Sequence, residues 1–335
     1  MSAEDNRRSS RAVLITGAAG YIGTLLTRSL VADPGDLELI VATDIRERAP
    51  DYGQPEGNGA PPPGPKLLYS PMDVRDQALG QVIAEHDIDT VIHLAAIVSP
   101  RPEDTRQFLY SVEVEGTRNV LEACVQNGVD KLVITSSGAA YGYHPENAWY
   151  LDEDAPIRGN EAFAYSHHKR LVEQMLAQYR RSHPELSQLV FRVGTILGET
   201  AKNQITALFH KPAILGLRGV ATPFVFIWDQ DVVGCLRAGI FGQGSGTYNL
   251  AGDGALTLRE IATRLGKPYV TLPAGVVTGA LGVLQRLKLS RYGPEQVGFL
   301  QYRPVLDNRR LKREFGYRPR YSSREVFELY RRKNA

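Results

Sequence analysis

Three glycines near the start of the chain, Gly17, Gly20 and Gly23, lie where a short apolar, β-rich run passes into a helical pattern. With this spacing, the first glycine permits a tight turn, the second lets the backbone approach a phosphate, and the third lets the helix pack closely on the strand. The free N–H groups at the start of the helix favour an anion. The sequence therefore predicts a dinucleotide held at Gly17, Gly20, Tyr21, Ile22 and Gly23.

Asp44 ends the second predicted strand, where a dinucleotide site needs a hydrogen-bond acceptor. Its carboxylate can accept hydrogen bonds from both hydroxyls of the adenosine ribose, and it repels a 2′-phosphate. Arg46, two residues further on, could instead bind such a phosphate. We therefore predict NAD as the cofactor, with NADP as the less favoured alternative.

Short β-rich runs alternate with longer helical patterns from residue 11 to about residue 200. This alternation is typical of a parallel sheet covered by helices on both faces. Strands are expected at 12–16, 38–44, 66–69, 90–94, 131–135 and 188–193, and helices at 21–32, 77–86, 105–127 and 163–182. The stretch 49–65, rich in Pro and Gly, is expected to be an insertion loop.

The predicted fold is α/β, a doubly wound parallel sheet of the Rossmann type with a smaller C-terminal α/β substrate-binding region. We expect residues 1–10 to form a flexible tail. Residues 11–200 should form the NAD-binding Rossmann domain, including the catalytic residues. Residues 201–335, with shorter elements and more prolines, should mainly bind the substrate.

Tyr165 and Lys169 begin a helical pattern with an i, i+4 spacing, which puts the phenol and the ammonium on one face of the helix. A free tyrosine has a pKa of about 10. A neighbouring lysine charge favours the phenolate and lowers that pKa toward the range useful for general acid–base catalysis. Ser137, in the turn after a predicted strand, can hydrogen-bond the same substrate oxygen.

Together these motifs resemble the extended short-chain dehydrogenase/reductase superfamily, in its NAD-dependent epimerase/dehydratase group, which includes the UDP-glucose 4-epimerases. The resemblance spans nearly the whole chain and rests on the glycine turn, on Asp44, and on the runs Met-Asp-Val at 72–74, His-Leu-Ala-Ala at 93–96 and Tyr-x-x-x-Lys at 165–169. It implies further cofactor contacts from Ile45, Asp73, Val74, Leu94, Ala95, Ala96, Thr135, Tyr165 and Lys169. It also implies that Ser137, Tyr165 and Lys169 form a catalytic triad.

Four departures from the family pattern bear on the substrate. Ser137 is followed by Gly and Ala where the sugar dehydratases have two acids, which argues against dehydration. Glu113 stands where the family usually has Asn, and Thr195 replaces an amide that contacts the substrate. Phe224 falls where an Arg commonly binds the diphosphate. The last two favour a dehydrogenase acting on something other than a UDP-sugar.

The leading hypothesis is an NAD-dependent oxidoreductase that transfers a hydride between a secondary alcohol, of a sugar or another substrate, and NAD. Tyr165 exchanges the hydroxyl proton, Ser137 holds that oxygen, and Lys169 lowers the pKa of the phenol. The net reaction is either dehydrogenation or, in a sugar-nucleotide 4-epimerase with tightly held NAD, return of the hydride to the other face. A non-catalytic dinucleotide-binding redox sensor is the alternative of another class.

The charges nearly cancel over the 335 residues, with 39 Lys and Arg against 37 Asp and Glu. We therefore expect a small-molecule substrate and neither a nucleic-acid nor a membrane partner. His167 and His168 are adjacent and have no accompanying acid or Cys cluster, so no metal is predicted. Two well-separated cysteines suggest reduced thiols and a cytoplasmic protein. The family resemblance implies a homodimer formed through the helices after Gln107 and Phe163.

The most apolar late stretch, 270–289, is interrupted by Pro273 and by Gln285 and Arg286. Between these breaks it is too short to cross a bilayer. A helix of the second region is the preferred interpretation, and a membrane-surface helix is the alternative.

Overall fold

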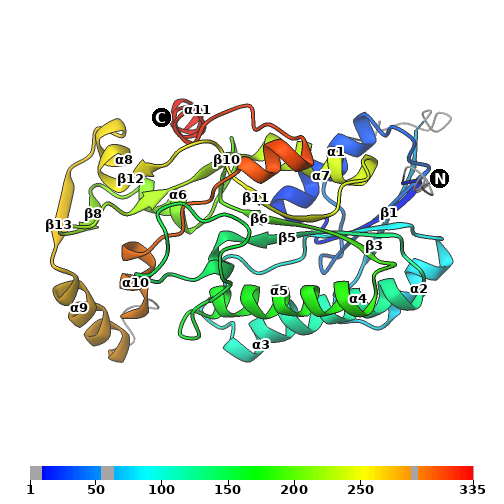
Figure 1. Ribbon diagram of the computed structural model, residues 1–335, viewed down its shortest axis with the longest axis horizontal. Coiled ribbons are helices and arrows are strands. Elements are labelled where there is room, and N and C mark those ends of the chain that lie inside the picture. Colours follow the sequence, from blue (N-terminus) through cyan, green and yellow to red (C-terminus); the bar gives the residue numbers. More distant parts are fainter. Residues whose placement is uncertain (1–9, 54–63, 288–292, 335) are drawn as a thin grey trace.

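A parallel sheet crosses the middle of the molecule in the computed structural model, which describes residues 10–53, 64–287 and 293–334 (Figure 1). Within these residues the sheet has seven strands in the order β11-β6-β5-β4-β1-β2-β3. They are β1 (Ala12–Thr16), β2 (Leu39–Asp44), β3 (Lys66–Pro71), β4 (Thr90–His93), β5 (Lys131–Ser137), β6 (Ser187–Val193) and β11 (Gly246–Leu250). The chain reverses its direction across the sheet between β1 and β4, which leaves a crevice at their carboxyl ends.

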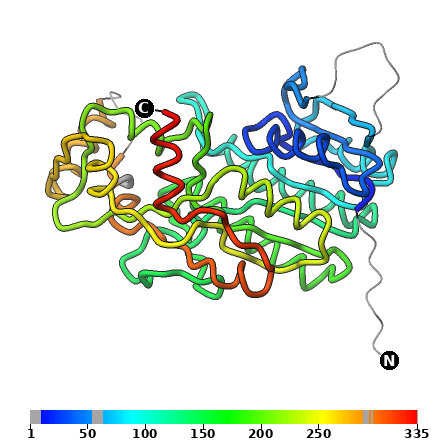
Figure 2. Tube along the Cα trace, turned by 90° about the horizontal axis from the view of Figure 1, so that it is seen from above, coloured from blue at the N-terminus to red at the C-terminus, as the bar shows by residue number. Residues whose placement is uncertain are grey.

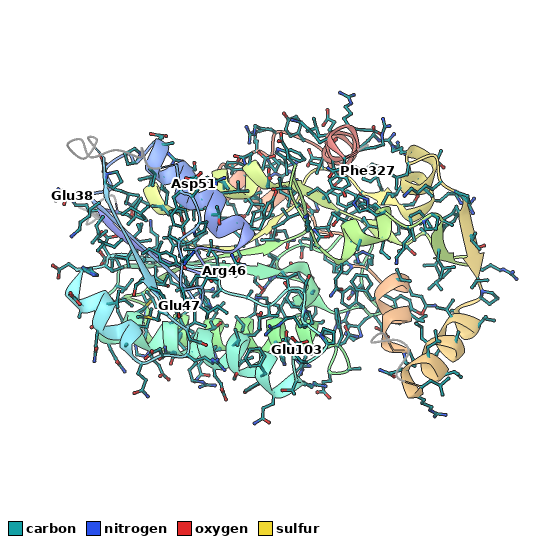
Figure 3. All side chains as sticks on the ribbon, turned by 180° about the vertical axis from the view of Figure 1, so that it is seen from behind. Glu38, Arg46, Glu47, Asp51, Glu103 and Phe327 are labelled. Atoms are coloured by element: carbon teal, nitrogen blue, oxygen red, sulfur yellow. The ribbon has the colours of Figure 1, made fainter. Side chains whose placement is uncertain are left out.

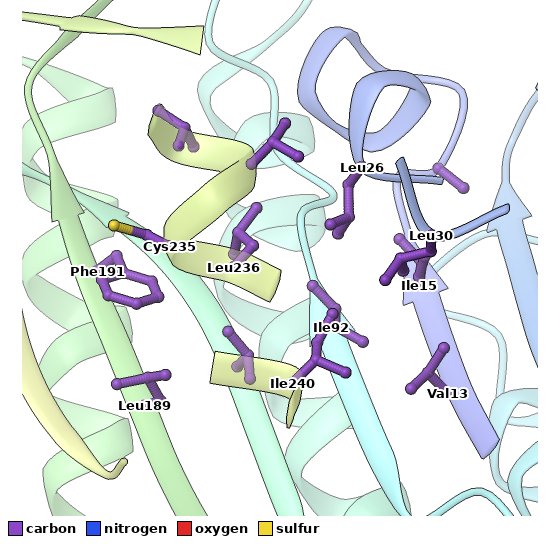
Figure 4. Packing of buried hydrophobic residues seen from close by; sticks show 14 of the residues in the cluster. Val13, Ile15, Leu26, Leu30, Ile92, Leu189, Phe191, Cys235, Leu236 and Ile240 are labelled. Carbon is purple, nitrogen blue, oxygen red and sulfur yellow. The ribbon is translucent and has the colours of Figure 1, made fainter. Parts of the chain in front are cut away.

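Helices cover both faces of the sheet, as buried parallel strands require. Val13 and Ile15 of β1 pack toward one face with Leu26, whereas Leu14 packs toward the other. Figure 4 shows the first of these two cores, into which Cys235 also points. The helices are α1 (Tyr21–Ala32) and α7 (Asp229–Phe241) on the first face, and α2 (Ala78–Glu85), α4 (Gly116–Gln126) and α5 (Ala164–Ser182) on the second.

The elements expected in the N-terminal part are confirmed, with ends that differ by one or two residues. The exception is the helix expected over 105–127, which divides into α3 (Arg106–Tyr110), a π-helical turn (Ser111–Glu115) and α4. The hydroxyl of Thr117 donates to the Glu113 carbonyl at 2.6 Å. This side-chain bond competes with the helical N–H groups for the carbonyl. Glu113 therefore lies at a local widening of the helix, a feature often found at functional sites.

The predicted fold class is confirmed, but a division at residue 200 cuts across the sheet. Helix α7 and strand β11 return to the sheet from the C-terminal part of the chain. Ser10, expected in the flexible tail, is buried, and its hydroxyl donates to the Ile240 carbonyl at 2.8 Å. Residues 1–9 and most of the expected loop at 49–65 lie outside the described residues.

A second lobe is built mainly from residues after 200 and forms one end of the long axis (Figures 1 and 2). Its core contains the packed rings of Phe209, Phe226 and Phe327. The strand pairs are β7 (Thr195–Leu197) with β10 (Phe226–Trp228), β9 (Pro223–Phe224) with β12 (Leu256–Thr257), and β8 (Ile214–Leu217) with β13 (Tyr269–Leu272). The helices are α6 (Gln204–Phe209), α8 (Leu258–Arg264), α9 (Ala274–Arg286), α10 (Glu295–Gln301) and α11 (Ser323–Lys333).

One buried ion pair ties helix α5 to the sheet. Glu173 of α5 accepts hydrogen bonds from the guanidinium of Arg192 on β6 at 2.7 to 3.0 Å, and from Ser136 of β5 at 2.6 Å. Arg192 also donates to the Tyr141 hydroxyl and to the Glu153 carbonyl. Burial alone would lower the pKa of Arg192, but the bonded carboxylate of Glu173 outweighs burial and raises it. Each side chain of the pair is only 7% exposed, so removal of one leaves the other charge buried.

Replacing Arg192 with Met should destabilise the protein by about 3–5 kcal/mol, because the buried carboxylate of Glu173 would lose its cationic partner and keep only the hydrogen bond from Ser136. Chemical denaturation followed by circular dichroism measures this change. The matched control is Arg181, which is exposed on helix α5, the helix that carries Glu173. Arg181→Met should change stability by less than about 0.5 kcal/mol. Equal stability of the two variants would show that the pair does not hold α5.

Candidate active site

A cavity of about 550 Å³ opens at the carboxyl ends of the strands, between the sheet and the second lobe. This volume is ordinary for a small-molecule site. The predicted site residues that line it are Gly17, Gly20, Tyr21, Ile22, Gly23, Leu94, Ala96, Thr135, Ser137, Tyr165 and Lys169. The fold thus brings the glycine turn and the Ser, Tyr and Lys of the predicted triad to one cavity.

The glycine turn leaves no room for side chains. Gly17 has a φ of +69°, and a Cβ there would lie 2.6 Å from the backbone nitrogen of Ala95. A Cβ on Gly23 would lie 2.2 Å from the Gly17 carbonyl oxygen. Helix α1 begins directly after the turn, at Tyr21, and the Tyr21 hydroxyl donates to Asp229 at 2.5 Å. The positive end of α1 therefore faces the cavity across a bare backbone, which fits a bound pyrophosphate.

Asp44 is held at this turn. One of its carboxylate oxygens accepts from the Ala19 N–H at 3.1 Å and the other from the Arg46 N–H at 3.2 Å. Arg46, labelled in Figure 3, donates to the Ala19 carbonyl and has its Nε 4.0 Å from Asp44. An acid and a guanidinium thus stand together where the adenosine ribose of a dinucleotide is expected.

Five predicted cofactor residues do not line the cavity, namely Asp44, Ile45, Asp73, Val74 and Ala95. Ile45 is 72% exposed just past the end of β2. Asp73 pairs with Arg75 at 2.6 Å, and the bonded guanidinium lowers the pKa of Asp73. Val74 is buried against Gly116, where an added Cβ would lie 2.7 Å from it. Their contacts with a cofactor therefore stay predictions.

Tyr165 and Lys169 lie one turn apart on α5, as their spacing predicts, with the Lys169 ammonium 5.6 Å from the centre of the phenol ring. The pKa of Tyr165 is raised, contrary to the expected lowering, because burial outweighs the Lys169 charge and the Ser137 side chain, which both act in the opposite direction. The Ser137 hydroxyl also accepts from the Ala139 N–H at 3.1 Å, which fixes its orientation. The three side chains therefore form one connected group.

Glu113 is a fourth member of this group that sequence reasoning did not assign. One of its oxygens lies 2.9 Å from Lys169 Nζ, and the other accepts from the Ile97 N–H at 2.6 Å. The side chains of Glu113 and Lys169 are only 3% and 6% exposed. Burial would lower the pKa of Lys169, but the Glu113 carboxylate outweighs it and raises it. The same negative charge raises the pKa of Tyr165, so Glu113 opposes the acidifying effect of Lys169.

A cation from the second lobe, Arg303, also lines the cavity. Its guanidinium lies between the rings of Phe224 and Phe299, with the central carbon 4.0 and 4.3 Å from their centroids. Its Nη2 donates to the Thr195 hydroxyl at 3.3 Å. Within the described chain, Nε and Nη1 of Arg303 have no hydrogen-bond partner. Burial lowers the pKa of Arg303 to about 10, so it is charged at neutral pH.

Phe224 itself is fully buried behind Arg303 and does not line the cavity. The substitution that argued against a diphosphate ligand therefore lies outside the site, and a different residue supplies the cation. The sequence offered little signal for this, because Arg303 is one of many arginines in the C-terminal part and reaches the cavity only through the fold. His93 is buried, and its two ring nitrogens lie 2.7 and 3.0 Å from the hydroxyls of Thr16 and Thr117.

A parallel sheet with a glycine turn at its switch point is the architecture of the Rossmann-type α/β enzymes. The family model that matches residues 13–214 is that of the NAD dependent epimerase/dehydratase family. The chain belongs to this family.

The chain is also similar to individual members over nearly its full length. It is 28% identical to the UDP-glucose 4-epimerase of Mycolicibacterium smegmatis, over 96% of this chain and 99% of that protein. The structure of MoeE5 in complex with UDP-glucuronic acid and NAD superposes with a TM-score of 0.71 and 24% identity, over 96% of this chain and 98% of that one. The UDP-glucose 4-epimerase of Thermus thermophilus, in complex with NAD, has a TM-score of 0.70, 24% identity and the same coverage. At these identities the structures establish the shared fold.

Replacing Asp44 with Ser should shift cofactor preference from NADH toward NADPH by about tenfold or more. The change removes the carboxylate that repels a 2′-phosphate and leaves Arg46 in place to bind it. Fluorescence titration with the two reduced cofactors measures the ratio of dissociation constants. Asp51→Ser, at an exposed acid further along the chain, is the control and should leave the ratio unchanged. An unchanged ratio in the Asp44 variant would remove Asp44 from the ribose site.

Replacing Glu113 with Gln should lower the pKa of Tyr165, because a phenolate forms more easily once the nearby negative charge is gone. The groups that act on the phenol are Lys169, Glu113, Ser137 and Tyr143. Phenolate absorbance against pH, with the matching Tyr165→Phe protein subtracted, measures the shift.

The control for this change is Glu115→Gln, an exposed acid in the same π-helical turn, which should leave the Tyr165 titration in place. A titration of Tyr165 that moves to higher pH in the Glu113 variant would contradict the assigned role.

Proposed function

We propose that the protein is an NAD-dependent 4-epimerase of sugars carried on a nucleoside diphosphate. The observation that carries the proposal is the position of Arg303 in the same cavity as the glycine turn and Tyr165. A buried cation with unused N–H groups is stabilised by an anionic ligand. Guanidinium groups favour phosphate oxygens as ligands, so a diphosphate is the anion that we expect beside Arg303.

The glycine turn, the start of α1 and Asp44 fit NAD. Gly17, Gly20 and Gly23 give the bare backbone that a pyrophosphate needs, and Asp44 offers the ribose acceptor. When bound there, NAD would supply the hydride acceptor for oxidation of the sugar carbon and the hydride donor for its reduction. The adjacent guanidinium of Arg46 is the feature that keeps NADP as the less favoured cofactor.

The side chains of the cavity supply the proton transfer. Tyr165 accepts the proton of the sugar hydroxyl as the carbon is oxidised, and donates it back after the keto sugar has turned. Ser137, which lines the same cavity as Tyr165, holds the same sugar oxygen. Lys169 keeps a positive charge beside the phenol and so favours the phenolate, and its ammonium can also bond the nicotinamide ribose.

Dehydrogenation with release of reduced cofactor is the competing reaction on the same residues. The expectation of a substrate other than a UDP-sugar depended on Thr195 and Phe224. Phe224 lies behind the cavity wall, and Thr195 accepts a hydrogen bond from Arg303, so both are compatible with a diphosphate. The homodimer implied by the family resemblance is part of the proposal, with α4 and α5, which lie along the same face of the sheet (Figure 1), as the expected contact.

Replacing Tyr165 with Phe should reduce epimerisation by about a hundredfold or more, because no group then exchanges the hydroxyl proton. The assay incubates the purified protein with a panel of nucleoside-diphosphate hexoses and separates the 4-epimers by chromatography, while absorbance reports reduced cofactor. NAD binding should be unchanged. Tyr150→Phe, at a half-exposed tyrosine outside the cavity, is the control.

The same panel separates the alternatives. Net accumulation of reduced cofactor with an oxidised sugar would show a dehydrogenase. Equal turnover by wild type and the Tyr165 variant would remove Tyr165 from the chemistry. Arg303→Met should raise KM for the nucleotide sugar more than it lowers kcat, and an unchanged KM would remove the diphosphate site.

A further inference from the structure

Helix α9 (Ala274–Arg286) stands at the far end of the second lobe and carries no charged side chain before its last residue, Arg286 (Figure 1). Its inner side packs on the lobe, where Val277 lies buried in a small cluster with Leu217 and Val297. Leu281 packs against the same cluster. Val277 and Leu281 therefore supply the apolar contacts that attach α9 to the lobe.

The outer side of α9 is apolar as well. Val276, Val283, Leu284 and Leu287 are exposed by 55%, 56%, 38% and 61%. Their spacing of seven, eight and eleven residues places them on one side of the helix. A surface helix of a globular protein normally turns polar residues outward, and a helix that is apolar all round is normally covered by protein or lipid.

The apolar surface continues from α9 onto the neighbouring strand pair. Val270 and Leu272 of β13 are exposed by 46% and 36%, and Leu215 of β8, which pairs with Val270, by 45%. Pro273 joins the strand directly to the helix. We call this surface, formed by Leu215, Val270, Leu272, Val276, Val283, Leu284 and Leu287, the α9 face.

Basic side chains border the α9 face. The chain from residue 261 to residue 294 contains no Asp or Glu. Lys267 bonds the Lys211 carbonyl at 2.8 Å at one end of β13, and the Arg218 N–H bonds the Leu272 carbonyl at 2.9 Å at its other end. Arg286 closes α9. In a chain whose overall charge is only +2, this is a local excess of positive charge around an apolar surface.

The overall charge balance led to the expectation of no membrane partner; against that expectation, we propose that the α9 face binds the surface of a bilayer containing anionic phospholipid. Exposed valines and leucines would enter the boundary between head groups and acyl chains, while the exposed Arg218 and Arg286 would meet the phosphates. The contact is peripheral, because no helix among the described residues is long and apolar enough to cross a membrane. The 13 residues of α9 span only about 20 Å.

The α9 face could instead be buried against a second copy of the chain. Across a two-fold contact, however, each basic border would meet its own copy, and like charges facing each other oppose association. Anionic head groups complement the same border. The charge pattern therefore favours the bilayer over self-association.

The proposed contact lies next to the cavity. Val297 of α10 packs in the same cluster as Val277 of α9, and Phe299 of α10 lines the cavity. Attachment through α9 would thus hold the cavity close to the membrane surface. The proposal concerns binding alone and does not depend on the reaction that the cavity catalyses.

Sedimentation of the full chain with vesicles tests the proposal. Wild type should sediment with phosphatidylcholine vesicles that contain phosphatidylglycerol, and much less with phosphatidylcholine alone. The double variant Val283→Gln with Leu287→Gln should show a vesicle partition coefficient lower by roughly tenfold or more. Arg218→Gln with Arg286→Gln should lose most of the dependence on phosphatidylglycerol. Both pairs are exposed, and unchanged thermal unfolding would show that the variants fold.

Trp149→Gln is the matched control, because Trp149 is an exposed apolar residue outside the α9 face. It should sediment like wild type. Three results would overturn the proposal: no sedimentation of wild type with either vesicle, equal sedimentation of wild type and the Val283/Leu287 variant, or concentration-dependent dimers that the Val283/Leu287 variant abolishes without any lipid binding.

Discussion

The ion pair between Glu173 and Arg192 is the interaction on which the active-site geometry depends. It connects α5, which carries Tyr165 and Lys169, to β6, and through Ser136 to β5, which ends at Ser137. The catalytic candidates are thus mounted on elements held together by one buried, hydrogen-bonded charge pair. The attraction within a buried ion pair is largely offset by the cost of desolvating both charges, so its net contribution to stability is small. Its hydrogen-bond geometry nevertheless favours one relative position of the helix and the strand. Its effect here is to set the position of α5 along the sheet.

A second buried charge pair, between Glu113 and Lys169, lies beside the phenol of Tyr165. The positive charge of Lys169 favours the phenolate form of Tyr165. The carboxylate of Glu113, paired with Lys169, partly cancels this effect. The π-helical turn places Glu113 there, and the Ile97 N–H fixes its second oxygen. A carboxylate in this position makes the phenol a better proton acceptor once ionised, and harder to ionise, than an amide would. The departure from the family pattern therefore changes the charge around Lys169 and Tyr165, since Glu113 forms an ion pair with Lys169.

The parts of the site that depend on neighbouring residues could be predicted from the sequence, and the parts that depend on distant contacts could not. The glycine turn and the Tyr165–Lys169 spacing are local patterns with one structural solution each. The pairing of Glu113 with Lys169 joins residues on two helices, and its geometry depends on a π turn that helical periodicity does not reveal. The return of β11 to the sheet was missed for a similar reason: a short strand after residue 200 has no pattern that assigns it to a particular edge.

Arg303 shows that a cation can be supplied to the cavity by a residue far in sequence from the position where the family pattern places it. Phe224 occupied the place expected for a diphosphate-binding arginine, which suggested that the anion site had been lost. In the structure, the ring of Phe224 supports the guanidinium of Arg303, so the position still serves the cation from behind. The positive charge reaches the cavity from a different segment of the second lobe. The elements of the second lobe are short and are joined by loops. Which of its side chains line the cavity therefore depends on tertiary contacts and cannot be read from local sequence patterns. Substrate recognition there is best judged from the contacts of the assembled cavity.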